Sequence, residues 1–94
     1  MTASRTVQVR IEGRVQGVGY RAWTEQVASE LGLSGWVRNR RDGTVEAVFQ
    51  GDPALVSDML ARCETGPSDA RVSRVTVTGE GVGSFHGFDV RPTV

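Results

Sequence analysis

The chain has 94 residues, which is the length of one small domain and excludes a large multidomain enzyme. Hydrophobic residues make up 38% and charged residues 23% of the chain, so a packed core is expected and general disorder is not. Eleven basic residues balance eleven acidic ones, and the net charge of zero gives no support for binding nucleic acid or an anionic membrane through bulk charge.

Arginine is the only fixed cation among the side chains, because the sequence contains no lysine. This excludes Schiff-base chemistry and the lysine of a P-loop, whereas the planar donor fork of a guanidinium matches phosphate or carboxylate. Residues 1–41 hold seven of the arginines and three of the acidic residues, so we expect anions to bind in this part of the chain. A general bias toward arginine codons is the alternative explanation.

Cys63 is the only cysteine, which excludes an internal disulfide and a cysteine-rich zinc site. We expect neither a metal nor a cofactor, since no cluster of His, Cys, Asp or Glu has metal-ligand spacing. No apolar signal core and no membrane-length apolar stretch is present, so we expect a cytoplasmic protein. His86, the lone histidine, is expected to be solvated, and Cys63 to fill the core.

The first two expected elements are a strand and a helix. Residues 6–12 alternate between polar and apolar side chains, which predicts a half-buried strand. Residues 22–31 repeat at helical spacing and predict an amphipathic helix closed by Gly32, with Thr24 and Glu25 facing water.

The middle of the chain predicts a hairpin and a second helix. Residues 33–39 and 44–50 are rich in β-branched and aromatic side chains and are joined through an Asp-Gly turn. Asp52 is the expected N-cap of a helix whose apolar stripe runs from Leu55 to Cys63 and which a Gly-Pro pair ends.

The end of the chain predicts two more strands, over residues 71–78 and, after the glycine-rich residues 79–87, over residues 88–91. The order βαββαβ with an additional strand is typical of the ferredoxin-like α+β fold, in which one mixed or antiparallel sheet carries both helices on one face. We therefore expect one domain over residues 1–94, with residues 1–4 flexible.

A glycine-rich loop, GRVQGVGYR at residues 13–21, joins the first strand to the first helix. A helix N-terminus leaves N–H groups unpaired and carries partial positive charge, and glycines let successive amides turn toward one centre. Arg21 adds a guanidinium at the same rim, so the loop predicts an anion site. The alternative is a plain turn that needs glycine for positive φ. The loop also fits G-x-G-x-x-A, but a hairpin replaces the parallel crossover that a dinucleotide fold needs.

Asn39 ends the strand predicted over residues 33–39, beside Arg38, Arg40 and Arg41. Its amide can donate and accept hydrogen bonds. At a strand end such an amide is either a turn-forming residue or a catalytic group, and the choice depends on whether it faces the glycine-rich loop.

These two segments closely resemble the acylphosphatase family. GRVQGVGYR matches the phosphate-loop signature of that family, and GWVRN at residues 35–39, followed by Asp42 and Gly43, matches its second motif. The resemblance extends over residues 5–91 and includes the βαββαβ order. It implies hydrolysis of carboxyl-phosphate mixed anhydrides to carboxylate and inorganic phosphate, without a metal.

The resemblance also implies a role for each site residue. Arg21 would bind the phosphate, and Asn39 would orient a water for in-line attack on the phosphorus. The backbone amides of the loop would cradle the phosphate; these residues are Val15, Gln16, Gly17, Val18, Gly19 and Tyr20. Two positions depart from the family pattern, since Tyr20 stands where many members have Phe and Arg40 where some have a small hydroxyl residue.

Other functions stay open at this point. A noncatalytic phosphate-binding or regulatory module would need the loop but not Asn39. A carbamoyl-phosphate-specific hydrolase is a second alternative, because a related unit begins the hydrogenase-maturation carbamoyltransferases. An RNA-binding sheet is disfavoured, since residues 44–50 offer no outward aromatic pair. We expect a monomer that acts on a small acyl phosphate, with no nucleic-acid or membrane partner.

Overall fold

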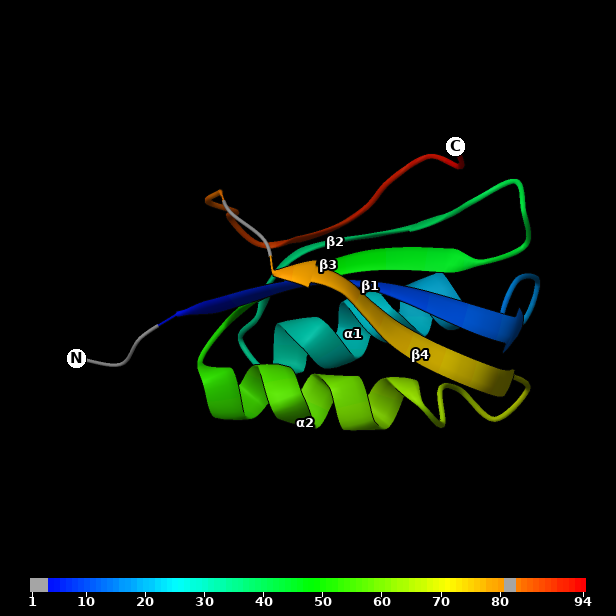
Figure 1. Ribbon diagram of the computed structural model, residues 1–94, viewed down its shortest axis with the longest axis horizontal. Coiled ribbons are helices and arrows are strands. Elements are labelled where there is room, and N and C mark those ends of the chain that lie inside the picture. The colour runs from blue at the N-terminus through cyan, green and yellow to red at the C-terminus, as the bar shows by residue number, and fades with distance from the viewer. Residues whose placement is uncertain (1–3, 81–82) are drawn as a thin grey trace.

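The computed structural model describes residues 4–80 and 83–94, in which a five-stranded sheet carries two helices on one face (Figure 1). The elements in chain order are β1 (Arg5–Arg14), α1 (Tyr20–Glu30), β2 (Ser34–Asn39), β3 (Val45–Gly51), α2 (Pro53–Cys63), β4 (Arg71–Glu80) and β5 (Phe88–Val90). The strand order is β4-β1-β3-β2-β5, and all neighbouring strands are antiparallel except β2 and β5. The expected ferredoxin-like α+β fold is confirmed.

Two short stretches lie outside the described residues. Residues 1–3 belong to the segment expected to be flexible, and residues 81–82 to the glycine-rich link before the last strand. The helices described are too short or too polar to cross a membrane.

The core lies between the sheet and the two helices (Figure 1). Alternation along β1 directs Val7, Val9 and Ile11 toward the helices, and all three are 0% exposed. Phe49 on β3 and Met59 on α2 complete the same layer and are also fully buried. Each such side chain contributes about 1.5–3 kcal/mol of burial free energy, so the alternating pattern of the sequence accounts for much of the stability.

Helix α1 starts earlier than expected and buries one polar residue that was expected to be exposed. It begins at Tyr20 rather than Ala22, and the prediction that Thr24 faces water is wrong, since Thr24 is 0% exposed. The Thr24 hydroxyl donates to the Tyr20 carbonyl at 2.8 Å, and this bond within the helix lets a polar side chain enter the core. The buried Tyr20 hydroxyl donates to the Cys63 carbonyl at 2.8 Å and ties α1 to α2. Burial raises the pKa of Tyr20 above its usual value and that of the Cys63 thiol to about 12.

Helix α2 follows most of its sequence signals. The Asp52 carboxylate accepts a hydrogen bond from the Ala54 amide at 2.8 Å, as an N-cap should. Cys63 and Met59 lie on the buried face, whereas Leu55, expected on the same stripe, is 37% exposed. Leu55 lies one residue before the buried row, and one helical step turns its side chain about 100° away from the core.

Strand β2 is paired on both of its edges. In the hairpin with β3, Asn39 lies opposite Val45. On the other edge the chain continues past β5 beside β2, where the Arg91 amide donates to the Val37 carbonyl at 2.9 Å and the Val94 amide to the Asn39 carbonyl at 3.1 Å. The backbone of Asn39 is therefore held from two directions.

Gly35 lies where β2 passes very close to β3. Its φ is +139°, and a Cβ at this position would overlap the backbone carbonyl oxygen of Val48. We expect Gly35→Ala to lower the free energy of unfolding by at least ~2 kcal/mol, because the backbone can move only by weakening the strand pairing. Urea denaturation of both proteins measures the difference.

Gly79→Ala on β4 is the matched control for this substitution. An added Cβ at Gly79 meets no atom within 4 Å, so we expect a change below ~0.5 kcal/mol. An equal loss of stability in the two variants would contradict the steric explanation for Gly35.

Candidate active site

The glycine-rich loop runs from the end of β1 to the first residue of α1. Gly17 and Gly19 have φ values of 74° and 80°, and this left-handed backbone explains why the loop needs glycine at these positions. Gly19 is the N-cap of α1, and no side chain caps the helix there. The backbone N–H groups of residues 15–20 donate to no other group in the described chain. They are unpaired donors at the positive end of a helix.

A pocket of about 330 Å³ opens beside this loop. It joins the two segments that the sequence singled out, because Arg21 and Asn39 both line it. The full lining is Val15, Gly17, Gly19, Tyr20, Arg21, Ala22, Glu25, Asn39 and Val90. Two of the expected loop residues do not line the pocket: Val18 packs against the core, and the Gln16 side chain turns toward the β2–β3 connection.

Arg21 is half-buried in the first turn of α1. Its guanidinium forms no hydrogen bond or ion pair with residues 4–80 or 83–94. Glu25, one turn later, lines the same pocket but lies beyond ion-pair distance of Arg21. Arg21 therefore brings to the pocket a guanidinium that has no ion-pair partner within the described chain.

Asn39 is only 9% exposed, at the end of β2. Its side-chain oxygen Oδ1 is buried and accepts no hydrogen bond from the part of the chain that is described. Leaving such an acceptor unpaired costs about 1–3 kcal/mol. Asn39 thus brings to the pocket an amide side chain whose acceptor has no partner within the described chain.

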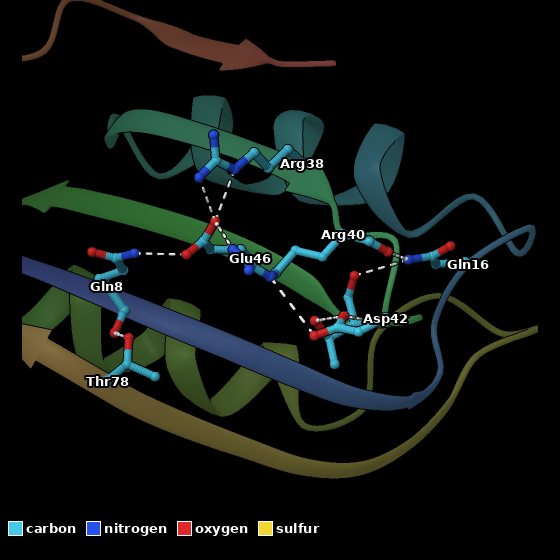
Figure 2. Close-up of polar contacts among 8 residues, drawn as sticks. Gln8, Gln16, Arg38, Arg40, Asp42, Glu46 and Thr78 are labelled. Carbon is cyan, nitrogen blue, oxygen red and sulfur yellow. Dashed lines mark hydrogen bonds and ion pairs between the residues drawn. The ribbon is translucent and has the colours of Figure 1, made fainter. Parts of the chain in front are cut away.

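The arginines beside Asn39 serve a different purpose. Figure 2 shows Arg38 and Arg40 turned toward the Glu46 carboxylate, which accepts from Arg38 Nε at 2.8 Å and from Arg40 Nη1 at 3.2 Å. Gln8 Nε2 donates to the same carboxylate at 2.7 Å. Burial disfavours ionisation of Glu46, but the hydrogen bonds from Arg38 and Gln8 and the two positive charges outweigh it, so its pKa lies below the usual value. Arg38 is therefore paired with Glu46, Arg40 is paired with Glu46 and also lies 3.8 Å from the Asp42 carboxylate, and neither arginine lines the pocket.

Ala22, Glu25 and Val90 line the pocket without having been singled out in the sequence. Glu25 is exposed, as expected. Residues four positions apart lie on the same face of a helix, so the spacing between Arg21 and Glu25 is the one sequence signal that could have placed Glu25 beside Arg21. Val90 comes from β5, whose parallel pairing with β2 places it opposite Val37. No local pattern predicts that pairing.

The remaining candidates lie elsewhere. His86 is exposed, in agreement with a solvated side chain, and Cys63 is 0% exposed in the core. Among the described residues, His, Cys, Asp and Glu form no group of three that could hold a metal ion.

Comparison with known proteins agrees with this arrangement. Residues 7–90 match the family model of acylphosphatases. The chain belongs to the acylphosphatase family. It is accordingly a hydrolase that acts on acyl phosphates.

Individual relatives show how much of the chain is shared. It is 65% identical to an acylphosphatase of Rhodopseudomonas palustris over 68 residues, which are 72% of this chain and 69% of that protein. It is 53% identical to an acylphosphatase of Bradyrhizobium diazoefficiens over 94 residues, covering 94% of this chain and 95% of the relative. The solved structure of an acylphosphatase from Coxiella burnetii superimposes with a TM-score of 0.89 at 35% identity, covering 94% and 93% of the two chains. The similarity thus includes both segments that line the pocket.

Proposed function

We propose that this family member hydrolyses acyl phosphates by in-line attack of a water that Asn39 orients, while the amides of residues 15–20 and the Arg21 guanidinium hold the phosphate. One observation carries the proposal. Four residues of the loop with its unpaired N–H groups line one pocket together with Arg21, whose guanidinium is unpaired in the described chain, and Asn39, whose Oδ1 accepts no hydrogen bond there. In this proposal the loop N–H groups and Arg21 donate hydrogen bonds to the phosphate, and the Asn39 side-chain oxygen accepts one from the attacking water.

The chemistry needs orientation more than a strong base. An acyl phosphate already has a good carboxylate leaving group, so catalysis consists mainly of positioning the water and stabilising charge on the phosphoryl oxygens. The water oxygen forms a bond to phosphorus as the bond to the acyl oxygen breaks, and the carboxylate leaves with the electron pair. We propose that a phosphoryl oxygen of the substrate takes the proton from the water.

We propose that the protein makes fewer contacts with the acyl group of the substrate than with its phosphate. In the proposed complex the loop amides and the Arg21 guanidinium donate hydrogen bonds to the phosphoryl oxygens, and every acyl phosphate has these oxygens. The other side of the pocket is formed by Ala22, Glu25 and Val90, all of them exposed. We therefore propose that the acyl portion extends toward solvent and that many acyl groups are accepted.

Turnover of acetyl phosphate, with inorganic phosphate as an inhibitor, tests the proposal. Phosphate presents the same oxygens to the loop as the substrate does, so we expect competitive inhibition. We also expect turnover to persist in excess chelator, because the loop amides and Arg21 supply the positive charge. Purely noncompetitive inhibition, or activity lost to the chelator and restored by metal, would contradict the mechanism. Phosphate binding without any turnover would favour the noncatalytic module.

We also propose that the chain works as a single domain over residues 1–94 and as a monomer in the cytoplasm. The zero net charge and the single, buried cysteine support this assignment.

A further inference from the structure

Gln16 belongs to the glycine-rich loop, yet its side chain does not line the pocket. Its Nε2 atom donates to the carbonyl oxygen of Arg40 at 2.7 Å and to that of Thr44 at 2.9 Å (Figure 2). A side-chain NH₂ group has two hydrogens, and both are used by these bonds. Gln16 Nε2 therefore has no donor left for a phosphate oxygen.

The two carbonyls that Gln16 contacts close the turn between β2 and β3. The Arg40 amide donates to the Thr44 carbonyl at 2.9 Å, and the Gly43 amide donates to the Arg40 carbonyl at 3.1 Å. Asp42 stabilises the same turn by accepting from the Thr44 amide at 3.0 Å. This turn begins directly after Asn39, so it is one of the contacts that fix the Asn39 backbone, together with the pairing to Val45 and the bond from the Val94 amide.

The cradle and Asn39 come from different parts of the sheet. The cradle, residues 15–20, follows β1, whereas Asn39 ends β2, and β3 lies between those two strands. Within the described parts of the chain, the bonds from Gln16 are the only hydrogen bonds that join the cradle to residues 40–44. Gln16 thus connects the donors that surround the phosphate to the segment that carries the water-orienting amide.

We propose that Gln16 is a positioning residue, which holds Asn39 at the correct distance and angle from the phosphate cradle. The inference rests on the proposed function, because it requires Asn39 to orient the water. In-line attack is sensitive to small displacements, and a shift of about 1 Å can cost roughly a hundredfold in rate. The side chain of Gln16 therefore affects the rate through Asn39, while its backbone amide stays in the cradle.

The test compares Gln16→Met in the wild-type and Asn39→Ala backgrounds. Methionine keeps the length of the side chain but removes the donors. In the wild-type background we expect kcat to fall about ten- to a hundredfold, with the inhibition constant of inorganic phosphate changed less than about threefold. In the Asn39→Ala background we expect Gln16→Met to lower kcat by less than about twofold, because the residue through which it acts is already gone.

Gln50→Met is the matched control. Gln50 Nε2 also makes two hydrogen bonds, to Thr6 Oγ1 at 2.9 Å and to the Gly83 carbonyl at 2.7 Å, but it lies at the other end of β3. We expect kcat of this variant to equal that of the wild type. Thermal unfolding of all variants separates a loss of rate from a loss of folded protein.

Gln16→Glu is a second variant with a different readout. Its ionised carboxylate would face two carbonyl oxygens and could donate to neither, whereas the protonated form can donate one hydrogen bond. Because the repulsion favours the protonated carboxyl, we expect the kcat of this variant relative to the wild type to rise as the pH falls. A ratio that does not change with pH would contradict the contact with the turn.

Three results would overturn the inference. An unchanged kcat in Gln16→Met would show that Asn39 is held without Gln16. Equal slowing in both backgrounds would show an effect that does not pass through Asn39, and a proportional loss of phosphate affinity would make Gln16 a binding residue. If Asn39→Ala alone leaves kcat unchanged, the proposed function itself fails, and that single variant distinguishes this case from the others.

Discussion

Asn39→Ala is expected to separate phosphate binding from turnover. Without the amide the attacking water is no longer oriented, so we expect kcat to fall by roughly 10²–10⁴. The cradle and Arg21 do not involve the Asn39 side chain, and the affinity for inorganic phosphate should change little. Steady-state kinetics with acetyl phosphate and calorimetric titration with phosphate measure the two quantities on the same preparation.

The stability of Asn39→Ala provides its internal control. The buried Oδ1 atom accepts no hydrogen bond from the described chain, so the substitution breaks no such bond to it. We expect the free energy of unfolding to change by less than ~1 kcal/mol. If phosphate affinity and kcat/KM fall together while kcat is unchanged, Asn39 is a binding residue and the water-orienting role is wrong.

Arg21→Ala is expected to abolish both phosphate binding and turnover, and Arg21→Lys should also be severely impaired. A lysine keeps the charge but cannot reproduce the two-pronged contact of a guanidinium with phosphate. By analogy with the loss of an oxyanion donor, the cost in transition-state stabilisation should be at least ~3 kcal/mol, which is more than a hundredfold in kcat/KM.

Arg74→Ala is the matched control for the loss of one guanidinium. Arg74 is exposed on β4 and does not line the pocket, so we expect its removal to leave kcat/KM near the wild-type value. Retention of more than a tenth of the activity by Arg21→Lys would contradict the proposed role, because a point charge would then suffice.

Local sequence patterns predicted most of the fold and the glycine-rich half of the candidate site. The alternation of β1, the Asp-Gly turn and the N-cap at Asp52 depend on neighbours only a few residues away, and such neighbours are visible in a sequence. The same holds for the glycine-rich loop, where Gly17 and Gly19 supply the positive φ that exposes the amides. The residues alone left Asn39 as either a turn residue or a catalytic group, and it was the resemblance of the two segments to the acylphosphatase family that joined Arg21 and Asn39 in one hypothesis before any contact was known.

The contacts between distant segments were decided only by the tertiary structure. Thr24 enters the core because the Tyr20 carbonyl accepts its hydroxyl, which helical periodicity based on polarity cannot anticipate. Arg40 turns away from the pocket because Glu46, six residues later, faces it across the hairpin and is itself held by Gln8 of β1. The bond from Gln16 to the β2–β3 turn likewise depends on the order of the strands in the sheet. Sequence periodicity indicates which face of a helix or strand is buried. Strand order and register decide which residues contact that face. Residues far apart in the chain determine that order and register together, so no local pattern predicts them.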